Sequence, residues 1–220
     1  MKSISRFFAH HVFRPLLERY LASERTYRYS DFTIKILPGV FHPAFFFSTK
    51  FLLAYLLEFK LEKKSLLELG AGSGLISFAA ERHGAVVTAT DLGRKSVENL
   101  ILNKSLLKSG IRIIHSDLFD KIPVVEFDYI VVNPPYYPKQ PDSDAALAWY
   151  CGANFEYFEK LFSRLDSFLH AETKSLMVLS EDCDLQRISA IAFANKFLMN
   201  KVKSSKFWWE WNYIFEIKRM

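Results

Sequence analysis

The chain has 220 residues, of which 50% are hydrophobic and 16% are aromatic. This length suits one domain, and this composition provides a large core and excludes an intrinsically disordered protein. The net charge of +5 is concentrated at the two ends, because residues 1–28 and 196–220 each carry six Lys and Arg against two Glu. Such basic ends suit contacts with phosphates, and they are equally typical of a protein that is merely soluble.

Neither a membrane anchor nor a metal centre is expected. The best apolar run, residues 51–59, contains Glu58 and is far shorter than the ~20 residues that cross a bilayer. Basic residues and histidines interrupt the N-terminal apolar residues, so no secretory signal is predicted. Cys151 and Cys183 have no metal or redox spacing, and the six histidines are scattered. We therefore expect reduced, buried thiols in a cytoplasmic protein.

The first part of the chain predicts a basic extension made of a helix and a short strand. Apolar residues recur at helical spacing over 4–23, and they alternate with polar residues over 27–37 as in a strand. A helix is then predicted over 48–59, with Ser48 or Thr49 as its N-cap.

From residue 65 onward, strand and helix patterns alternate. Strands are predicted over 65–69, 85–90, 112–115, 127–132 and 175–179. Helices are predicted over 74–82, 94–108, 154–169 and 184–196. The tail, residues 197–219, is β-rich. This alternation is typical of an α/β fold in which helices cover both faces of a mostly parallel sheet.

A stiff polar loop follows the strand predicted over 127–132. Its residues are Asn133, Pro134, Pro135 and Tyr136. Two consecutive prolines end the strand, and Pro134 keeps Asn133 extended because the residue before a proline is excluded from the helical region. An amide and an aromatic ring are thereby held at the carboxyl end of a strand, which is where open α/β sheets bind ligands. The long loop that follows, residues 137–149, is either a substrate lid or a simple connector.

A glycine-rich turn joins the first predicted strand of the alternating part to its helix. It reads Glu68-Leu69-Gly70-Ala71-Gly72-Ser73-Gly74. Glycine lets the backbone turn tightly and approach a ligand, and such turns are generally nucleotide sites. The G-x-G-x-G spacing differs from the G-x-G-x-x-G of dinucleotide-binding proteins, and no Gly-Lys-Ser/Thr of a phosphate-binding P-loop is present.

Two acidic residues follow the next two predicted strands. Asp91 lies 21 residues beyond Gly70, and its carboxylate can accept hydrogen bonds from ribose hydroxyls. Asp117, followed by Leu118, can accept from an adenine amine, although an isolated Asp here is also typical of a turn or a helix cap. Three successive strand ends therefore carry groups that suit an adenosine ligand.

These motifs, taken in order, resemble those of class I methyltransferases that use S-adenosylmethionine (SAM). They are most similar to the release-factor glutamine methyltransferases and the small-domain methyltransferases of RNA bases. The resemblance implies SAM as cofactor, bound by Thr49, Glu68, Gly70, Ala71, Gly72, Gly74, Asp91, Asp117, Leu118 and Asn133. It implies Asn133, Pro134 and Tyr136 as catalytic residues. Helix capping explains Thr49 equally well.

The resemblance also implies a fold and a division of the chain. We expect a Rossmann-like, seven-stranded, mostly parallel sheet with helices on both faces and a C-terminal antiparallel β-hairpin. Residues 1–47 are expected to form the basic extension, and residues 48–220 the SAM-dependent methyltransferase domain.

The chemistry implied is methyl transfer to a planar NH2 group. Such a nitrogen is a poor nucleophile, because its lone pair is delocalised. The side-chain oxygen of Asn133 and the carbonyl of Pro134 can each accept one of its N–H bonds, and Tyr136 can stack on it, a contact worth ~1–3 kcal/mol for a base. No strong base is required, so the protein contributes mainly positioning and electrostatics.

The sequence leaves the substrate open. We expect a macromolecule, slightly favouring the exocyclic amine of an RNA or DNA base over a protein glutamine, and a monomeric enzyme without metal or membrane. A non-catalytic SAM-binding module and a nicotinamide-dependent oxidoreductase are the alternatives from other classes. Trp149 and Tyr150 are either substrate contacts or packing residues. The C-terminal aromatic residues in question are Trp208, Trp209, Trp211 and Tyr213. They either stack on bases or belong to a half-buried strand, and the alternating pattern favours the strand.

Overall fold

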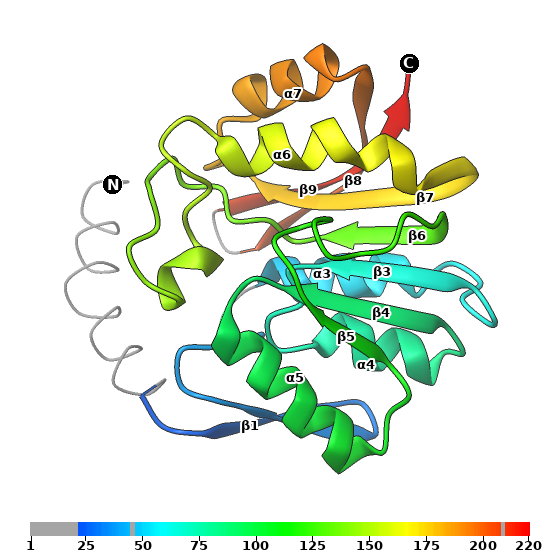
Figure 1. Cartoon of the computed structure of the whole chain (residues 1–220), viewed down its shortest axis with the longest axis vertical. Helices are drawn as coiled ribbons and strands as arrows, with labels where there is room; N and C mark the ends of the chain where they lie inside the picture. Colours follow the sequence, from blue (N-terminus) through cyan, green and yellow to red (C-terminus); the bar gives the residue numbers. More distant parts are fainter. Residues whose placement is uncertain (1–21, 45–46, 208–209) are drawn as a thin grey trace.

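The computed structural model describes residues 22–44, 47–207 and 210–220 (Figure 1). The helix predicted over 4–23 therefore lies almost wholly outside the described residues. Within the described part, the strands form a two-stranded sheet and a seven-stranded sheet. The smaller sheet pairs β1 (Arg25–Tyr29) with β2 (Phe32–Ile36). The larger sheet contains β3 (Ser65–Leu69), β4 (Val86–Asp91), β5 (Arg112–His115), β6 (Phe127–Val132), β7 (Leu169–Ser180), β8 (Phe197–Phe207) and β9 (Glu210–Arg219).

The order of the seven strands is β5-β4-β3-β6-β7-β9-β8. Strands β3 to β7 are parallel to one another, whereas β9 runs antiparallel to both β7 and β8. The predicted Rossmann-like sheet with a C-terminal hairpin is therefore confirmed. The chain leaves β3 toward β4 and β5 and returns to β6 on the other side of β3. Such a switch in strand order opens a crevice at the carboxyl ends, where α/β proteins bind ligands.

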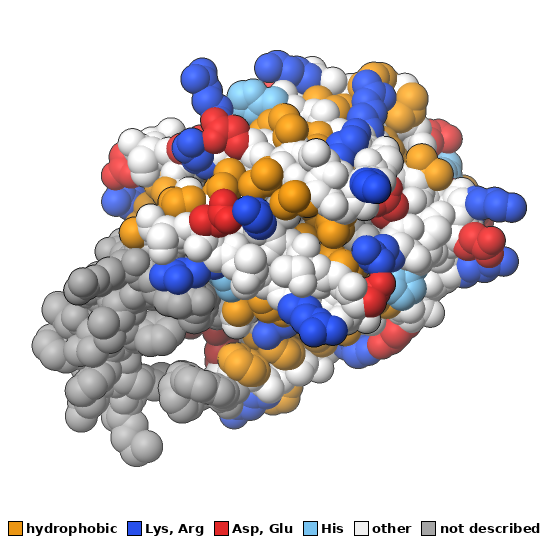
Figure 2. All heavy atoms as spheres, turned by 90° about the horizontal axis from the view of Figure 1, so that it is seen from below, with side chains coloured by type: hydrophobic (Ala, Val, Ile, Leu, Met, Phe, Trp, Pro, Cys, Tyr) orange, Lys and Arg blue, Asp and Glu red, His pale blue; other side chains and the backbone are white. Residues whose placement is uncertain are grey.

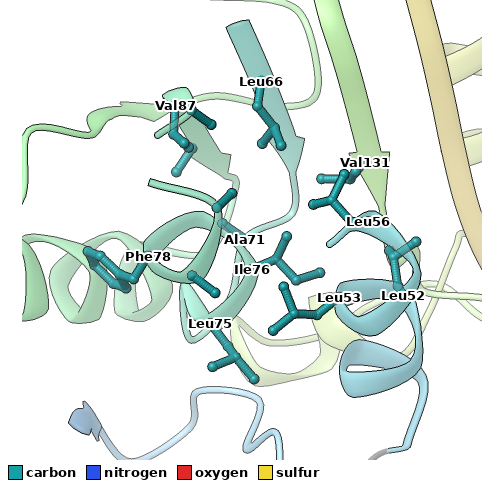
Figure 3. Close-up of a cluster of buried hydrophobic side chains, with 14 of the residues drawn as sticks. Leu52, Leu53, Leu56, Leu66, Ala71, Leu75, Ile76, Phe78, Val87 and Val131 are labelled. Atoms are coloured by element: carbon teal, nitrogen blue, oxygen red, sulfur yellow. The ribbon is translucent and has the colours of Figure 1, made fainter. Parts of the chain in front are cut away.

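Helices cover both faces of this sheet. On one face lie α3 (Phe47–Leu56), α4 (Leu75–Arg82) and α5 (Arg94–Leu107), and on the other lie α6 (Glu156–Leu165) and α7 (Leu185–Ala194). Successive strand residues point to opposite faces, so Leu66 packs with α3 and α4 (Figure 3) while Leu67 packs with α6 and α7. Two hydrophobic cores thus hold the sheet between two helical layers.

The segment predicted as one strand over 27–37 is a hairpin. A left-handed turn at Ser30, with φ 50°, separates β1 from β2. The side chains of Phe32, Ile34 and Ile36 are buried in the core that contains α3 and α4. The alternation over 27–37 was correct for β2, but the turn was missed because Ser is not a typical residue for a positive φ.

The helix predicted over 154–169 is shorter than expected. It ends at Leu165, a 3-10 turn follows at Asp166–Phe168, and β7 begins at Leu169 rather than at residue 175. The reason is tertiary, because Nη2 of Arg219 donates to the carbonyl oxygens of Asp166 and Leu169, at 2.6 and 2.9 Å. A distant residue thereby satisfies the carbonyl groups that a longer helix would have bonded internally.

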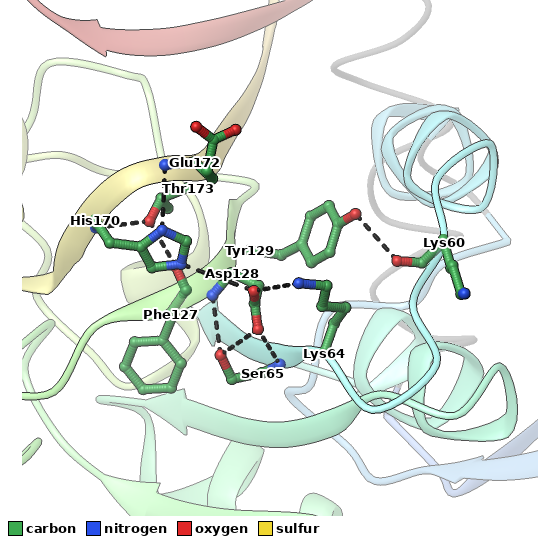
Figure 4. Close-up of polar contacts among 9 residues, drawn as sticks. All are labelled: Lys60, Lys64, Ser65, Phe127, Asp128, Tyr129, His170, Glu172 and Thr173. Atoms are coloured by element: carbon green, nitrogen blue, oxygen red, sulfur yellow. Dashed lines mark hydrogen bonds and ion pairs between the residues drawn. The ribbon is translucent and has the colours of Figure 1, made fainter.

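Asp128 links three neighbouring strands at the amino ends of the sheet (Figure 4). Its carboxylate accepts from the backbone N–H and the hydroxyl of Ser65, at 2.8 and 2.9 Å, and from Lys64 Nζ at 2.8 Å. His170 Nε2 lies 3.7 Å from the same carboxylate. The hydrogen bond from Lys64, together with those from Ser65, lowers the pKa of Asp128 to about 2. This network lies opposite the glycine-rich turn and braces the sheet.

In the part of the chain that the structure describes, no helix is both long and apolar enough to span a membrane. The same residues contain no group of three His, Cys, Asp or Glu side chains that could hold a metal ion. Cys151 and Cys183 are unpaired thiols with buried side chains.

Candidate active site

A cavity of about 420 Å³ lies at the carboxyl ends of the parallel strands. Strand pairing explains its position, because Leu69 at the end of β3 lies beside Thr90 of β4 and Val132 of β6. Of the predicted cofactor-binding residues, those that line it are Thr49, Glu68, Gly70, Ala71, Gly72, Asp91, Asp117, Leu118 and Asn133. Pro134 and Tyr136 line it as well.

The glycine-rich turn offers bare backbone to this cavity. Gly70 and Gly72 have φ values of 72° and 52°, which are left-handed conformations that favour glycine. A Cβ on Gly70 would project into open space, and one on Gly72 would meet only the Cβ of Phe41, at 3.7 Å. At these two positions the turn therefore presents backbone without a side chain to the cavity.

Gly74 is the one predicted cofactor residue that does not line the cavity. It also has a positive φ, of 81°, but a Cβ there would come within 2.6 Å of Leu100 and Phe78. The structure accounts for this glycine by close packing at the start of α4, so its predicted contact with a cofactor has no support in the geometry.

Asp91 braces the glycine-rich turn from the neighbouring strand. Its Oδ2 accepts from the backbone N–H of Gly72 and its Oδ1 from that of Gly93, both at 2.8 Å. Burial raises the pKa of Asp91, and these two hydrogen bonds oppose that change. The carboxylate is thus fixed at the cavity wall, with one oxygen on the glycine turn and one on the start of α5.

Glu68 lies beneath the turn, and its side chain is only 5% exposed. Its carboxyl group accepts a hydrogen bond from the hydroxyl of Ser77. Burial raises the pKa of Glu68 to about 8, although the contacts with Ser77 act in the opposite direction. Burial therefore favours the neutral form of this group, whereas a cation beside it would favour the charged form.

Two residues of α6 complete the end of the cavity near Asp117. Lys160 Nζ lies 2.6 Å from Oδ2 of Asp117 and 2.6 Å from Oδ2 of Asp120. Tyr157 also lines the cavity, and burial raises the pKa of its hydroxyl. No sequence motif marks either residue, since each lies in an ordinary amphipathic helix about 40 residues beyond Asp117.

Asn133 is held by the first turn of α3. Its Nδ2 donates to Thr49 Oγ1 at 3.0 Å and to Ser48 Oγ at 3.3 Å. Because α3 begins at Phe47, neither hydroxyl residue is the N-cap that the sequence suggested. Instead, the two hydroxyl groups fix the amide with its nitrogen toward α3.

Tyr136 is more enclosed than a free stacking platform. Its ring packs against the core on the α6 side of the sheet and lies 4.8 Å from the ring of Tyr137, centroid to centroid. Burial raises the pKa of its hydroxyl, and Ser180 at the end of β7 acts in the opposite direction. The ring is thereby held in one position beside the cavity.

The predicted loop 137–149 forms a roof over the cavity. It contains a short 3-10 helix, Ala145–Ala148. Its lining residues include Gln140, Pro141, Leu147 and Trp149, and the ring of Trp149 lies 5.8 Å from that of Phe41. Tyr150, just after the loop, also lines the cavity. Both aromatic residues that the sequence singled out here therefore face the site.

Of the C-terminal aromatic residues, Trp208 and Trp209 lie outside the described residues. Tyr213 lies on β9 and packs against the core on the α6 and α7 side, as the half-buried strand interpretation requires. Trp211 is 39% exposed, and Lys206 Nζ lies 5.8 Å from its ring centroid.

Comparison with known proteins identifies the family. The family model for the methyltransferase small domain matches residues 31–154. A release factor glutamine methyltransferase of Fusobacterium nucleatum is 38% identical over 84 residues, which cover 36% of this chain and 24% of the relative. A tRNA1(Val) (adenine(37)-N6)-methyltransferase of Shewanella loihica is 30% identical over 128 residues, which cover 54% of this chain and 53% of the relative. The chain thus spans about half or less of the length of these relatives.

Solved structures support the fold independently. A 16S rRNA methyltransferase of T. thermophilus, in complex with AdoMet and guanosine, is 20% identical and has a TM-score of 0.65. The match covers 88% of this chain and 50% of that one. The family match over more than half of the chain confirms the predicted resemblance to methyltransferases that use SAM. This chain belongs to the methyltransferase small domain family.

Proposed function

We propose that this protein is a SAM-dependent N-methyltransferase that acts on a planar NH2 group. The observation that carries the proposal is the placement of Asn133, whose amide is anchored by Thr49 at the wall of the cavity that also contains the glycine turn and Asp91. A cradle for a nucleoside-like cofactor and a hydrogen-bonding group for an amine thereby meet at one place.

The residues at the cradle fit SAM. The bare backbone at Gly70 admits a ligand where any other residue would place a Cβ. Asp91 suits the ribose hydroxyls, and Asp117 suits the exocyclic amine of adenine. When bound there, SAM supplies an electrophilic methyl group.

The protein's own contribution is to position the acceptor nitrogen. With Nδ2 of Asn133 donating to the α3 hydroxyls, its Oδ1 is available to accept one N–H of the substrate. The carbonyl of Pro134 accepts the other, so the lone pair of the nitrogen points away from both oxygens and toward the cofactor. Tyr136 contacts the flat face of the acceptor. Holding two reactants in this geometry accounts for most of the catalysis expected here.

For the substrate, we propose a nucleic-acid base amine, with a protein glutamine as the alternative. The relatives act on both kinds of NH2 group, since one is named for glutamine and another for N6 of a tRNA adenine. Lys206 Nζ of β8 lies 5.8 Å from the ring centroid of the exposed Trp211 of β9, in the C-terminal hairpin. Cations beside aromatic rings suit single-stranded nucleic acid. On the face seen in Figure 2, by contrast, Lys and Arg are mixed with Asp and Glu.

The substrate class is tested by transfer of labelled methyl groups from SAM to an extract of the source cells. Aliquots are then treated with nuclease or with protease. Label that only nuclease removes supports a base amine, and label that only protease removes supports a protein side chain. Absence of label from both fractions would contradict a macromolecular substrate.

Two substitutions separate the two halves of the proposed site. Asn133→Ala is expected to abolish methyl transfer while leaving the affinity for S-adenosylhomocysteine (SAH) within about threefold of wild type, because the side chain acts on the acceptor. Asp91→Ala is expected to weaken SAH binding more than about tenfold, since it removes both the ribose acceptor and the brace on Gly72. Isothermal titration measures the affinity of wild type and of both variants for SAH, and the affinity of wild type for NADH. Tight binding of NADH, or unchanged SAH affinity in Asp91→Ala, would contradict the assignment.

A further inference from the structure

The roof loop, residues 137–149, is closed at its base by backbone hydrogen bonds. The N–H of Tyr137 donates to the carbonyl of Trp149, and the N–H of Cys151 donates to the carbonyl of Tyr137, both at 3.0 Å. The N–H of Gly152 donates to the carbonyl of Lys139 at 3.1 Å. The two ends of the loop are therefore fixed to each other, and the position of its far end depends on other contacts.

The far end is held by Asp144. Its Oδ1 accepts from the backbone N–H of Arg94 and its Oδ2 from that of Lys95, both at 3.1 Å. These are the first two residues of α5, whose own N-cap, Gly93, has no side chain to cap them. An acidic side chain 50 residues further along the chain thus takes the place of the missing cap, where the helix dipole also favours a negative charge.

Asp91 is bound to the same end of α5. Its Oδ1 accepts from Gly93, immediately before the two N–H groups that Asp144 binds. A Cβ on Gly93 would lie 3.2 Å from Oδ1 of Asp91 and 3.6 Å from Oδ2 of Asp144. The carboxylate proposed for the ribose and the carboxylate of the roof therefore meet at one glycine.

The closed loop covers the cavity at this point. Asp144 itself lines the cavity, together with Leu147 and Ala148 of the 3-10 helix and Pro141 before it. On its other side the roof contacts the N-terminal half of the chain through Trp149, whose ring lies 5.8 Å from that of Phe41. A cofactor bound to Asp91 and the glycine turn would lie beneath these residues.

We infer that Asp144 is a positioning residue that clasps the roof loop to the start of α5 and thereby retains the bound cofactor. This inference rests on the proposed function. Opening the clasp breaks two hydrogen bonds to a helix N-terminus and exposes the cavity, so the clasp controls how fast the cofactor leaves. It leaves the chemistry at Asn133 unchanged, because that residue is anchored separately on α3.

The test compares three variants with wild type: Asp144→Ala, Asp144→Asn and Asp142→Ala. The first removes both acceptors, and the second keeps one oxygen and so one hydrogen bond. Asp142 belongs to the same loop and does not line the cavity. Its carboxylate accepts from the hydroxyl of the adjacent Ser143 at 3.3 Å and lies 3.9 Å from Lys139 Nζ, both within the loop, so it serves as the control. Labelled SAH is bound to each protein, and its release into excess unlabelled SAH is followed in time.

Asp144→Ala is expected to release SAH about tenfold faster, with the association rate changed less than about threefold, as the loss of a helix cap predicts. Asp144→Asn is expected to be intermediate, and Asp142→Ala unchanged. Hydrogen exchange should show faster exchange at Arg94 and Lys95 in Asp144→Ala, and thermal unfolding identifies a variant that has simply lost its fold. If Asp144→Ala has lost its fold, Asp144→Asn tests the inference instead. An intermediate rate of SAH release supports it, and a wild-type rate contradicts it.

Two results would overturn the inference in different ways. If wild type binds SAH and Asp144→Ala releases it at the wild-type rate, Asp144 does not retain the cofactor and only this inference fails. If wild type does not bind SAH at all, the proposed function fails together with it.

Discussion

Asn133 illustrates how much a single site residue depends on a distant part of the chain. Its amide nitrogen donates to Thr49, which precedes it by 84 residues. The neighbouring proline limits its backbone, and the hydroxyl groups of α3 fix its side chain. Each contact removes one freedom of the amide before any substrate arrives, and this preorganisation lowers the cost of binding the amine in a reactive geometry.

At the same scale, Glu68 gives the protein a pH-dependent stability. Burial raises its pKa to about 8, from an ordinary value of 4.5. As the pH rises, the Glu68 carboxyl group therefore ionises in the unfolded chain before it ionises in the folded one. The free energy of unfolding accordingly falls as the pH rises from 4.5 to about 8. Glu68→Gln cannot ionise and keeps an oxygen that accepts from Ser77. We therefore expect the melting temperature of Glu68→Gln, relative to that of wild type, to be higher at pH 9 than at pH 5 by about 3 °C or more.

Thermal unfolding followed by circular dichroism at both pH values measures this difference. Glu98→Gln, on the exposed side of α5, is the matched control. If the melting curves of wild type and Glu68→Gln shift in parallel with pH, the buried carboxyl group is not the cause.

At the scale of elements, β6 is connected to its neighbours at both ends. Its carboxyl end leads into Asn133, and its amino end carries the Asp128 network that reaches β3 and β7. The network stabilises the register of β6 against β3, in which Leu69 lies beside Val132. It therefore also helps to set the position of Asn133 relative to Gly70, the residues that follow this pair.

Asp128→Asn is expected to lower the free energy of unfolding by about 1–2 kcal/mol at pH 7. The substitution removes the negative charge and one of the two acceptor oxygens, and the loss is limited because solvent already screens part of the ion pair with Lys64. The lowered pKa, about 2, means that wild type keeps this contribution above pH 3.8 and loses it as the pH falls toward 2. Urea unfolding at pH 7, 4 and 3 should show the gap between the two proteins narrowing. A gap that is constant over this range would contradict the role of the charge.

At the scale of the whole molecule, the N-terminal hairpin is integrated into the catalytic fold. We propose that residues 1–47 form an extension of the methyltransferase domain at 48–220. Phe32, Ile34 and Ile36 of its described part are buried in the main core. Asn103 of α5 imitates a neighbouring strand, since it accepts from the N–H of Lys35 and donates to its carbonyl, both at 2.7 Å.

Asn103→Ala is therefore expected to cost about 2 kcal/mol of stability, as two hydrogen bonds are lost and the backbone groups of Lys35 become unpaired. Urea unfolding measures the loss, and hydrogen exchange should show less protection over residues 32–37. Ser105→Ala, on the exposed side of α5, is the control. Unchanged stability and unchanged exchange would show that the hairpin is held by its apolar side chains alone.

Sequence patterns alone predicted the type of each large element of the described catalytic part, because hydrophobic period distinguishes a helix from a strand locally. They also predicted that the glycine turn, Asp91, Asp117 and Asn133 would meet. That inference succeeds because the carboxyl ends of parallel strands necessarily lie on one edge of a sheet.

Only the tertiary structure decided which side chains complete the site. The anchor of Asn133 on α3, the pairing of Lys160 with Asp117 and the clasp of Asp144 on α5 each join residues 40 or more positions apart. Neither their spacing nor their residue types distinguish them from ordinary caps and surface charges. Such contacts depend on how helices and loops pack over the sheet, and packing is a property of the folded chain that no local pattern encodes.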